Sequence, residues 1–363
     1  MLKKKNPCMA FVLLFTLLLT MFAGVNVHAA TNYYVSPSGN DSNPGTSTSS
    51  PFKTIEKAVS AAAAGSTVYL LSGTYTYGTN MSSTIVLGSK SGASTSNRPK
   101  LMAYDSSNKP VLNFSGQSVS SSSIGINITG SYWTVSGLII KNCGDNAILM
   151  KGSSSTYNII NSCETYSNAD TGIQISSGAS YNTVKYCVSK YNCDPDEGNA
   201  DGFACKLSPG AGNTFDNCIA EYNSDDGFDL YQCYTAVTIT NSKANYNGYF
   251  SNGTATSGNG EGFKLGGDDA NVAHTVTNCS AAGNQKKGFS SNNNPGKTVL
   301  TDCIAYEPQT VASGVTYYNF NMINGAVKIT NCYSYKYNST TASTKYRIKS
   351  GSTVSGGNMT ANY

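Results

Sequence analysis

The sequence predicts an all-β protein built as a single-domain right-handed parallel β-helix, a solenoid of short strands stacked coil upon coil. One observation is a repeat: Cys143 and Cys163 are 20 residues apart, and Cys163 and Cys187 are 24 apart, in closely similar surroundings. A period of this size, made of short strands without helical periodicity, is typical of a β-solenoid. A second observation is composition, with 36 glycines, 25 tyrosines and 12% charged residues among 363. Such a chain resembles neither a helical bundle nor a disordered protein.

From about Trp133 each repeat contains a short strand, a polar turn, a second strand and another turn. No coil can bury its apolar face alone, so neighbouring coils must share a continuous core. The strands expected from the alternation of apolar and polar residues lie at 134–140, 157–160, 182–184, 213–215, 237–240, 274–277, 297–300 and 327–330.

Cysteine recurs at one position of the repeat. The residues concerned are Cys143, Cys163, Cys187, Cys218, Cys279, Cys303 and Cys332. A repeated position filled by a small, buried-type residue predicts an inward-facing stack of thiols rather than a set of bridges. Cys193, Cys205 and Cys233 lie outside this pattern, and in an exported protein they are the expected disulfide candidates, with no pairing assigned.

The N-terminus has the features of a secretory signal peptide over residues 1–29. Lys3 to Lys5 precede an apolar run at 9–25, and Val27-His28-Ala29 offers small residues for cleavage. We therefore expect a secreted, extracellular monomer with no membrane association after cleavage; an uncleaved anchor is the alternative. The mature domain would span 30–363, with a cap at about 30–75 and coils at about 76–363. Without the three lysines, 21 basic residues face 20 acidic ones, which argues against nucleic-acid binding.

A short amphipathic helix is expected near the start of the mature chain. Residues 52–64 place Ile55, Ala58, Val59 and Ala62 on one face. Pro51 would begin this helix and Gly65 would end it. It would cover the open end of the solenoid.

A second repeated motif carries charge. It comprises the tetrads at 171–174, 201–204, 226–229, 261–264 and 287–290, each with glycine second and, in all but the first, phenylalanine third. If the tetrads stack, Asp201, Asp226 and Glu261 form one column, and Ala204, Asp229 and Lys264 form the column beside it. Adjacent coils are separated by about 4.8 Å. Asp201, Asp225, Asp226 and Asp229 would then converge, and such a group of carboxylates favours a hard cation, Ca²⁺. Ordinary Asp-Gly turns are the alternative.

These motifs resemble those of the family 9 polysaccharide lyases, calcium-dependent pectate lyases on a right-handed parallel β-helix. The resemblance covers essentially the whole mature chain. It rests on YYVSPSGND at 33–41, PFKTI at 51–55, NADGF at 199–203, NSDDGFD at 223–229 and GEGFKLG at 260–266. It implies that Asp201, Asp225, Asp226 and Asp229 ligate calcium and that Lys264 is the catalytic base.

The implied reaction is calcium-assisted β-elimination of α-1,4-linked polygalacturonate, with Lys264 taking the proton at C5. A lysine base predicts an alkaline optimum. The other interpretation of Lys264 is a structural ion pair with Asp229 or Glu261. Lys206 is a candidate contact for a substrate carboxylate, or else a solvated surface lysine.

Two other functions compete with the lyase. A hydrolase of the polygalacturonase kind would use neighbouring carboxylates such as Asp225 and Asp226, but the chain contains no Gly-His-Gly motif. His274, the only histidine after the signal, lies in a strand pattern and is expected in the core or between coils. A non-catalytic protein binding wall polysaccharide through tyrosines such as Tyr333, Tyr335 and Tyr337 is the third possibility.

Overall fold

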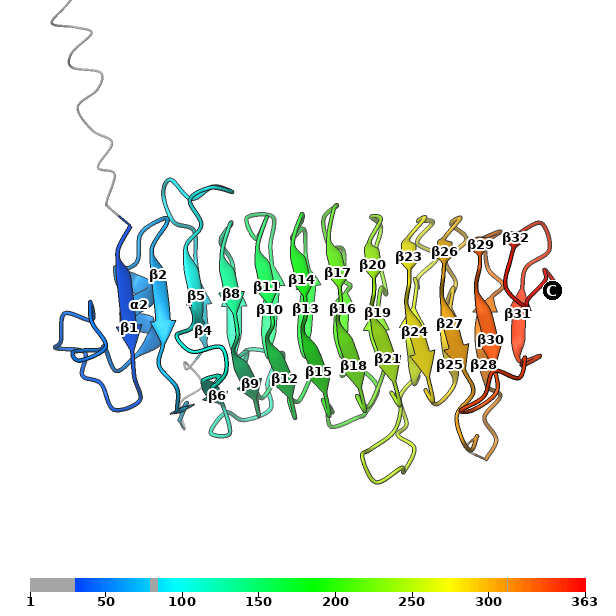
Figure 1. Cartoon of the computed structure of the whole chain (residues 1–363), viewed down its shortest axis with the longest axis horizontal. Helices are drawn as coiled ribbons and strands as arrows, with labels where there is room; N and C mark the ends of the chain where they lie inside the picture. The colour runs from blue at the N-terminus through cyan, green and yellow to red at the C-terminus, as the bar shows by residue number, and fades with distance from the viewer. Residues whose placement is uncertain (1–29, 79–83, 312) are drawn as a thin grey trace, which may run out of the picture.

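A computed structural model describes residues 30–78, 84–311 and 313–363. The predicted signal peptide at 1–29 lies outside the described residues. The described chain winds into three parallel sheets, A, B and C, whose strands stack along one axis (Figure 1). Each full coil contributes one strand to each sheet, so beyond β1 and β2, which pair directly, strands that follow each other in the chain lie in different sheets. The parallel β-helix expected from the repeat is confirmed.

Within the described residues, sheet A has twelve strands, and sheets B and C have ten each. Sheet A contains β1 (Asn32–Val35), β2 (Thr67–Leu70), β5 (Lys100–Ala103), β8 (Thr134–Ser136), β11 (Ile159–Asn161), β14 (Thr183–Lys185), β17 (Thr214–Asp216), β20 (Thr238–Thr240), β23 (Thr275–Thr277), β26 (Val299–Thr301), β29 (Lys328–Thr330) and β32 (Thr353–Ser355). Sheet B contains β3 (Thr74–Thr76), β6 (Val111–Asn113), β9 (Ile139–Lys141), β12 (Glu164–Tyr166), β15 (Val188–Lys190), β18 (Ile219–Glu221), β21 (Lys243–Asn245), β24 (Ser280–Ala282), β27 (Ile304–Tyr306) and β30 (Tyr333–Tyr335). Sheet C contains β4 (Ile85–Leu87), β7 (Ile126–Ile128), β10 (Ile148–Lys151), β13 (Ile173–Ser176), β16 (Phe203–Cys205), β19 (Phe228–Asp229), β22 (Glu261–Lys264), β25 (Lys287–Ser290), β28 (Tyr318–Met322) and β31 (Tyr346–Ile348).

The expected strand at 134–140 is two strands in the structure. β8 belongs to sheet A and β9 to sheet B, and Gly137 turns the chain between them with φ of 73°. Glycine adopts this left-handed conformation without steric cost. The strands of β1 to β3, which fall in the range expected to form the cap, already pair within sheets A and B.

Repeated side chains fill the interior. The rings of Phe203, Phe228, Phe263, Phe289 and Phe320 stack on the inner side of sheet C, with neighbouring centroids 4.7 to 5.0 Å apart. At the turn from sheet B to sheet C, each asparagine of a second stack accepts a hydrogen bond from the backbone N–H of the asparagine one coil before it; the stack contains Asn168, Asn192, Asn223, Asn247 and Asn284. These stacks hold successive turns in a fixed register.

The cysteine prediction is confirmed for six of the seven repeated positions and wrong for Cys143 and for the three cysteines outside the repeat. All seven are buried free thiols. Cys143, however, follows β9 of sheet B and its backbone N–H donates to Asn168 Oδ1, so it lies in line with the asparagine stack and not with Cys163, which follows β11 of sheet A. Ser242 replaces cysteine in one coil, accepting a hydrogen bond from Cys218 N and donating its own backbone N–H to Cys279 Sγ. Cys193, Cys205 and Cys233 are also free thiols. Cys205 takes an inward position in register with Ile175, so it serves as a core residue.

The N-terminal helix is shorter than expected. Helix α2 spans Ile55–Ala61, with Thr54 as the N-cap accepting a hydrogen bond from Lys57 N. Ile55, Ala58 and Val59 are buried as predicted, and the helix packs against β1, β2 and β4 at the N-terminal end (Figure 1). Because Thr54 supplies the cap, the helix begins four residues after Pro51.

His274 is an inter-coil residue, as predicted. It directly precedes β23 and is fully buried, and its Nδ1 accepts a hydrogen bond from Val237 N in the preceding coil. In earlier coils the same position is asparagine, where Asn158 and Asn182 accept equivalent backbone hydrogen bonds. Burial lowers the pKa of His274 to about 4. The histidine is therefore neutral at ordinary pH and faces the core.

None of the helices in the described part of the chain has the length and hydrophobicity of a membrane span.

Candidate metal and catalytic site

The predicted site residues gather on the outer side of sheet C, across β16, β19 and β22. The strand register aligns Ala204, Asp229 and Lys264 in one row, as the tetrads predicted. Asp201 and Asp226 lie two residues before the first residues of β16 and β19, and Gly202 N donates to Asp226 O. Stacked turns thus bring together residues that are up to 63 positions apart, from 201 to 264.

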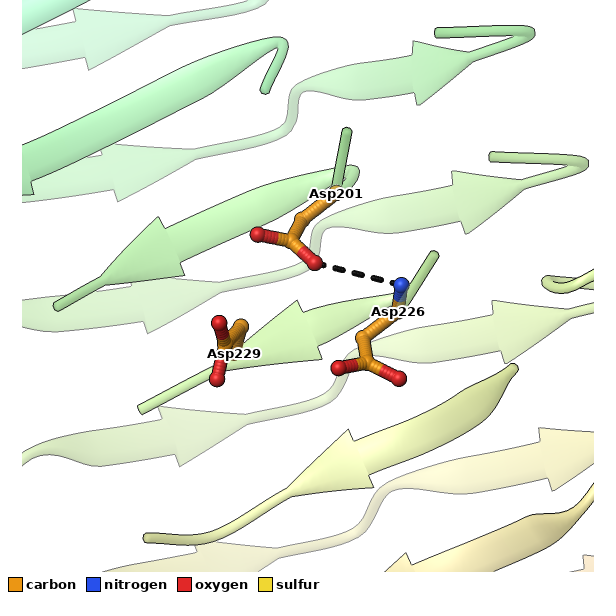
Figure 2. A group of neighbouring side chains, drawn as sticks. All are labelled: Asp201, Asp226 and Asp229. Carbon is orange, nitrogen blue, oxygen red and sulfur yellow. Dashed lines mark hydrogen bonds between the residues drawn. The ribbon is translucent and has the colours of Figure 1, made fainter. Parts of the chain in front are cut away.

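Three carboxylates form the centre of the site (Figure 2). Asp201, Asp226 and Asp229 each offer an oxygen atom within 4.8 Å of the others. Backbone donors hold all three: Asp226 N donates to Asp201 Oδ1 at 3.1 Å, shown as a dashed line, and Tyr231 N donates to Asp229 Oδ1 at 2.9 Å. Asp226 Oδ1 accepts from Glu261 N at 2.8 Å. The turns of three coils therefore orient this group.

Burial opposes the ionisation of Asp201 and Asp226. Asp201 and Asp226 are 0% exposed and Asp229 is 2% exposed. Burial raises the pKa of Asp201 to about 8, although Lys206 acts against it. Burial and the neighbouring Asp225 raise the pKa of Asp226 well above the ordinary range. Carboxylates held this close without water need positive charge nearby to remain ionised.

Lys264 supplies one positive charge. Its Nζ lies 3.0 Å from Asp226 Oδ2 and 3.5 Å from Asp229 Oδ1, and its side chain is 7% exposed. Burial alone lowers the pKa of Lys264, but the charges of Asp226 and Asp229 raise it above that of a free lysine. The ammonium also lies over the ring of Tyr231, 5.7 Å from its centroid. Lys264 therefore forms ion pairs with both carboxylates.

Lys206 supplies the second positive charge and is not a solvated surface lysine. It is 4% exposed, and its Nζ lies 2.6 Å from Asp201 Oδ2 and 3.5 Å from Asp229 Oδ2. It also donates to the side chain and backbone oxygens of Asn199. Burial alone lowers the pKa of Lys206, whereas Asp201 and Asp229 raise it. With its donors engaged by the protein, Lys206 is suited to hold Asp201 in place, and the structure favours this role over a substrate contact.

Asp225 lies beside the three carboxylates but outside their mutual 4.8 Å group. Its Oδ1 accepts a hydrogen bond from Asn259 N at 2.5 Å, and its side chain is 2% exposed. Burial raises its pKa to about 6. The structure thus brings three of the four predicted ligands together, and the role of Asp225 as a ligand stays a prediction.

The donor set suits a hard divalent cation. All the candidate ligand atoms are carboxylate oxygens, which calcium prefers. Asp226 Oδ2 is buried with no hydrogen-bond donor aligned to it, although Lys264 Nζ is near enough for an ion pair. A buried carboxylate oxygen without a donor is costly, and a cation would compensate it. Asp201, Asp226 and Asp229 therefore fit a calcium ion.

Comparison with known proteins assigns the family. The family model described as "Pel9A-like, right handed beta helix region" matches residues 33–338. The chain belongs to this family, the family 9 polysaccharide lyases. It is 45% identical over 295 residues to pectate lyase L of Paenibacillus polymyxa (strain SC2), covering 77% of this chain and 64% of that protein. It is 36% identical over 313 residues to pectate lyase L of Dickeya dadantii (strain 3937), covering 82% of this chain and 72% of that protein.

A solved structure agrees with this assignment. The crystal structure of pectate lyase Pel9A superposes with a TM-score of 0.72 at 31% identity, covering 90% of this chain and 82% of that one. The handedness of the family 9 β-helix confirms the predicted right-handed coil. The chain spans 64% of the length of the Paenibacillus protein, less than two thirds.

Sequence reasoning on this family 9 chain missed one ion pair at the site. Lys287 of β25 pairs with Glu261 of β22, so Glu261 is not the partner of Lys264. The signal was present, because the tetrads align Glu261 with Lys287. Glu261 Oε2 is buried without a donor, like Asp226 Oδ2.

Proposed function

We propose that this chain is a pectate lyase that cleaves α-1,4-linked polygalacturonate by calcium-assisted β-elimination, with Lys264 as the base. The observation that carries the proposal is Lys264 Nζ lying 3.0 Å from the Asp226 carboxylate, in a group of three buried aspartates that fits a cation. Relatives that are named pectate lyases support the same activity.

The proposed reaction needs one base and no nucleophile from the protein. The proton at C5 passes to Lys264 Nζ, and the electron pair of that C–H bond forms a double bond between C4 and C5. The bond from C4 to the glycosidic oxygen breaks, and that oxygen takes a proton. The products are one chain with a new reducing end and one with an unsaturated uronate at its non-reducing end. Lys264 suits the first step because it lies at the end of β22, in the outer row of sheet C and next to the carboxylates.

Asp201, Asp226 and Asp229 would hold the calcium ion, and we propose Asp225 as a fourth ligand. A bound calcium ion would draw charge from the substrate carboxylate and so make the C5 proton more acidic. Lys206 keeps Asp201 oriented through the contact at 2.6 Å. Tyr231 N does the same for Asp229. These contacts preorganise the carboxylates before any ligand binds.

Lys264 must lose its proton before it can accept another. The charges of Asp226 and Asp229 raise its pKa, and burial lowers it. A cation held by these two carboxylates would offset their negative charge, and this favours the neutral amine that the reaction requires. The rate should increase as the pH rises toward the pKa of Lys264, which gives an alkaline optimum. We further propose that the protein is exported and acts as a monomer outside the cell.

The test is the near-ultraviolet absorbance of polygalacturonate incubated with the purified protein, with added calcium and again with a chelator. We expect a calcium-dependent increase, since the conjugated double bond of the unsaturated product absorbs there. New reducing ends without this absorbance would mean hydrolysis instead. Binding of the polymer with neither signal would leave a non-catalytic wall-binding protein.

A further inference from the structure

The row of sheet C that contains Asp229 and Lys264 continues toward the C-terminus. In the strand register Lys264 pairs with Ser290, Ser290 with Asn321 and Asn321 with Arg347. Arg347 therefore lies three coils beyond Lys264. Since adjacent strands are about 4.8 Å apart, the two positions are separated by about 14 Å along the axis.

Asn321 lies on the outer side of sheet C with an unused acceptor. Its neighbours Phe320 and Met322 are both fully buried in the core, and alternate residues of a strand point to opposite sides. Asn321 is only 9% exposed, yet its Oδ1 is buried without a hydrogen-bond partner. A buried amide oxygen in this state is uncommon and indicates a missing donor. Gln174 Oε1, in the same row on the other side of Asp229, is also unpartnered.

Arg347 is held in place but unpaired. Its guanidinium lies 5.4 Å from the ring centroid of Tyr318 and 3.9 Å from that of Tyr363. None of the ion pairs of the described residues involves Arg347. Stacking on aromatic rings fixes the plane of a guanidinium while its N–H groups stay available at the edge. A planar, oriented arginine of this kind matches the geometry of a carboxylate.

The coil spacing suits a polyuronide. One 4-linked uronide unit adds to its chain a length close to the distance between adjacent strands. A chain lying along the row would therefore present about one carboxylate and one set of hydroxyl groups to each coil. The unit three positions from the one at Lys264 would reach Arg347.

We propose that Asn321 and Arg347 form a remote uronate-binding subsite, in which Arg347 binds a substrate carboxylate and Asn321 accepts a hydrogen bond from a sugar hydroxyl. This inference rests on the proposed lyase function for its substrate. The subsite contributes binding far from the scissile bond, and it makes the protein prefer chains long enough to span from Lys264 to β31.

The first test compares oligogalacturonates of different length. A trimer that spans the scissile bond extends at most two units beyond Lys264 toward β31, whereas a hexamer can reach Arg347. We expect Arg347→Ala to lower the ratio of kcat/KM for the hexamer to that for the trimer about tenfold, as expected for a lost charge-assisted hydrogen bond. Arg347→Lys should recover only part of the ratio, because an ammonium cannot bind a carboxylate with two parallel hydrogen bonds.

Lys328→Ala is the matched control, since Lys328 is an exposed cation on β29 of sheet A, near the same end of the solenoid. The control should leave the ratio unchanged. An unchanged ratio in Arg347→Ala, or an equal loss for trimer and hexamer, would overturn the proposal. Thermal melting of each variant separates a loss of binding from a loss of folding.

A second test does not depend on turnover. Calorimetric titration with hexagalacturonate compares Lys264→Ala with Lys264→Ala/Arg347→Ala and with Lys264→Ala/Lys328→Ala. We expect about tenfold weaker binding only in the variant that lacks Arg347. If the wild-type protein forms no unsaturated product, the lyase proposal fails while this titration still decides the subsite. Equal affinities in the three variants, or no binding by any of them, would overturn it.

Discussion

The inner and outer rows of sheet C are one residue apart in the chain and follow different rules. The inner row repeats phenylalanine in five successive coils, from Phe203 to Phe320. The outer row, in the same coils, reads Ala204, Asp229, Lys264, Ser290 and Asn321. Inward positions have one task, which is to stack and exclude water, so a single residue type suits every coil. Outward positions do not share this task, and each coil carries a different group there.

This contrast separates stability from activity along a single strand. Ring centroids 4.7 Å apart on the inner side keep β19, β22 and β25 in register. That register places Asp229 beside Lys264 on the outer side. Substitutions in the inner row should therefore lower stability, and substitutions in the outer row should lower activity.

Lys264→Ala should have the largest effect. We expect kcat on polygalacturonate to fall by about 10²- to 10⁴-fold, the usual contribution of a general base. The absorbance of the unsaturated product measures this, with calorimetry to verify that calcium still binds. Lys243→Ala, an exposed lysine on sheet B, is the control and should keep full activity. A Lys264→Ala protein with more than a tenth of the wild-type kcat would exclude Lys264 as the base.

Phe320→Ala tests the inner row and should cost about 3–5 kcal/mol of unfolding free energy, because it leaves a cavity beside Phe289. Asn321→Ala, one residue along, should cost less than about 1 kcal/mol, since the buried Oδ1 of Asn321 makes no hydrogen bond. Chemical denaturation of both variants measures the difference. Equal destabilisation by the two substitutions would contradict the inference that the inner row provides stability and the outer row provides activity.

Calcium ions and protons should compete for the carboxylates of the site. The folded state raises the pKa of Asp201 to about 8, so the folded protein binds a proton that the unfolded chain releases near pH 4. Without calcium, this carboxylate should lower the melting temperature as the pH rises from about 4 to 8. Calcium at about 100 times its Kd should raise the free energy of unfolding by about 2.7 kcal/mol at pH 8.

Melting curves in chelator and in calcium at pH 5 and pH 8 test this directly. Asp201→Asn is the control, because an amide cannot titrate. Its melting temperature in chelator should depend less on pH than that of the wild type. A calcium-induced increase that is larger at pH 5 than at pH 8 would contradict a site of raised carboxylate pKa values.

His274→Asn should have a smaller effect than calcium and should concern acid stability alone. Burial lowers the pKa of His274 to about 4, so the unfolded chain binds the proton first and stability is lost as the pH falls from about 6.5 to 4. Removing the titration should relieve about 2 kcal/mol of acid destabilisation at pH 5. Denaturation at pH 5 and pH 7.5 compares the two proteins, since asparagine fills the same position elsewhere. Identical pH dependence would mean that His274 is not the buried neutral group described.

Most of the inward-facing residues could be predicted from the sequence, but only some of the contacts made by the outward-facing residues of sheet C. The tetrads predicted the pairing of Asp229 with Lys264 correctly, because glycine and phenylalanine repeat beside them and mark the register. The ion pair between Lys206 and Asp201 could not be predicted, because the sequence does not show that this long side chain bends back to Asp201 instead of pointing to solvent. The alignment of Arg347 with Lys264 could not be predicted either, because the outer row has no repeated residue type that would mark its register.

Two of the longer loops lie at the same edge of the molecule. The chain between β21 and β22 and that between β27 and β28 both leave sheet B and return into sheet C, and the first projects clearly in Figure 1. Neither loop interrupts the stack of phenylalanine rings, because Phe228 stacks on Phe263 and Phe289 on Phe320 across them. The solenoid therefore offers a place where new sequence can be grafted beside the site without changing the scaffold. Exchange of these two loops between relatives would be a practical route to altered substrate preference.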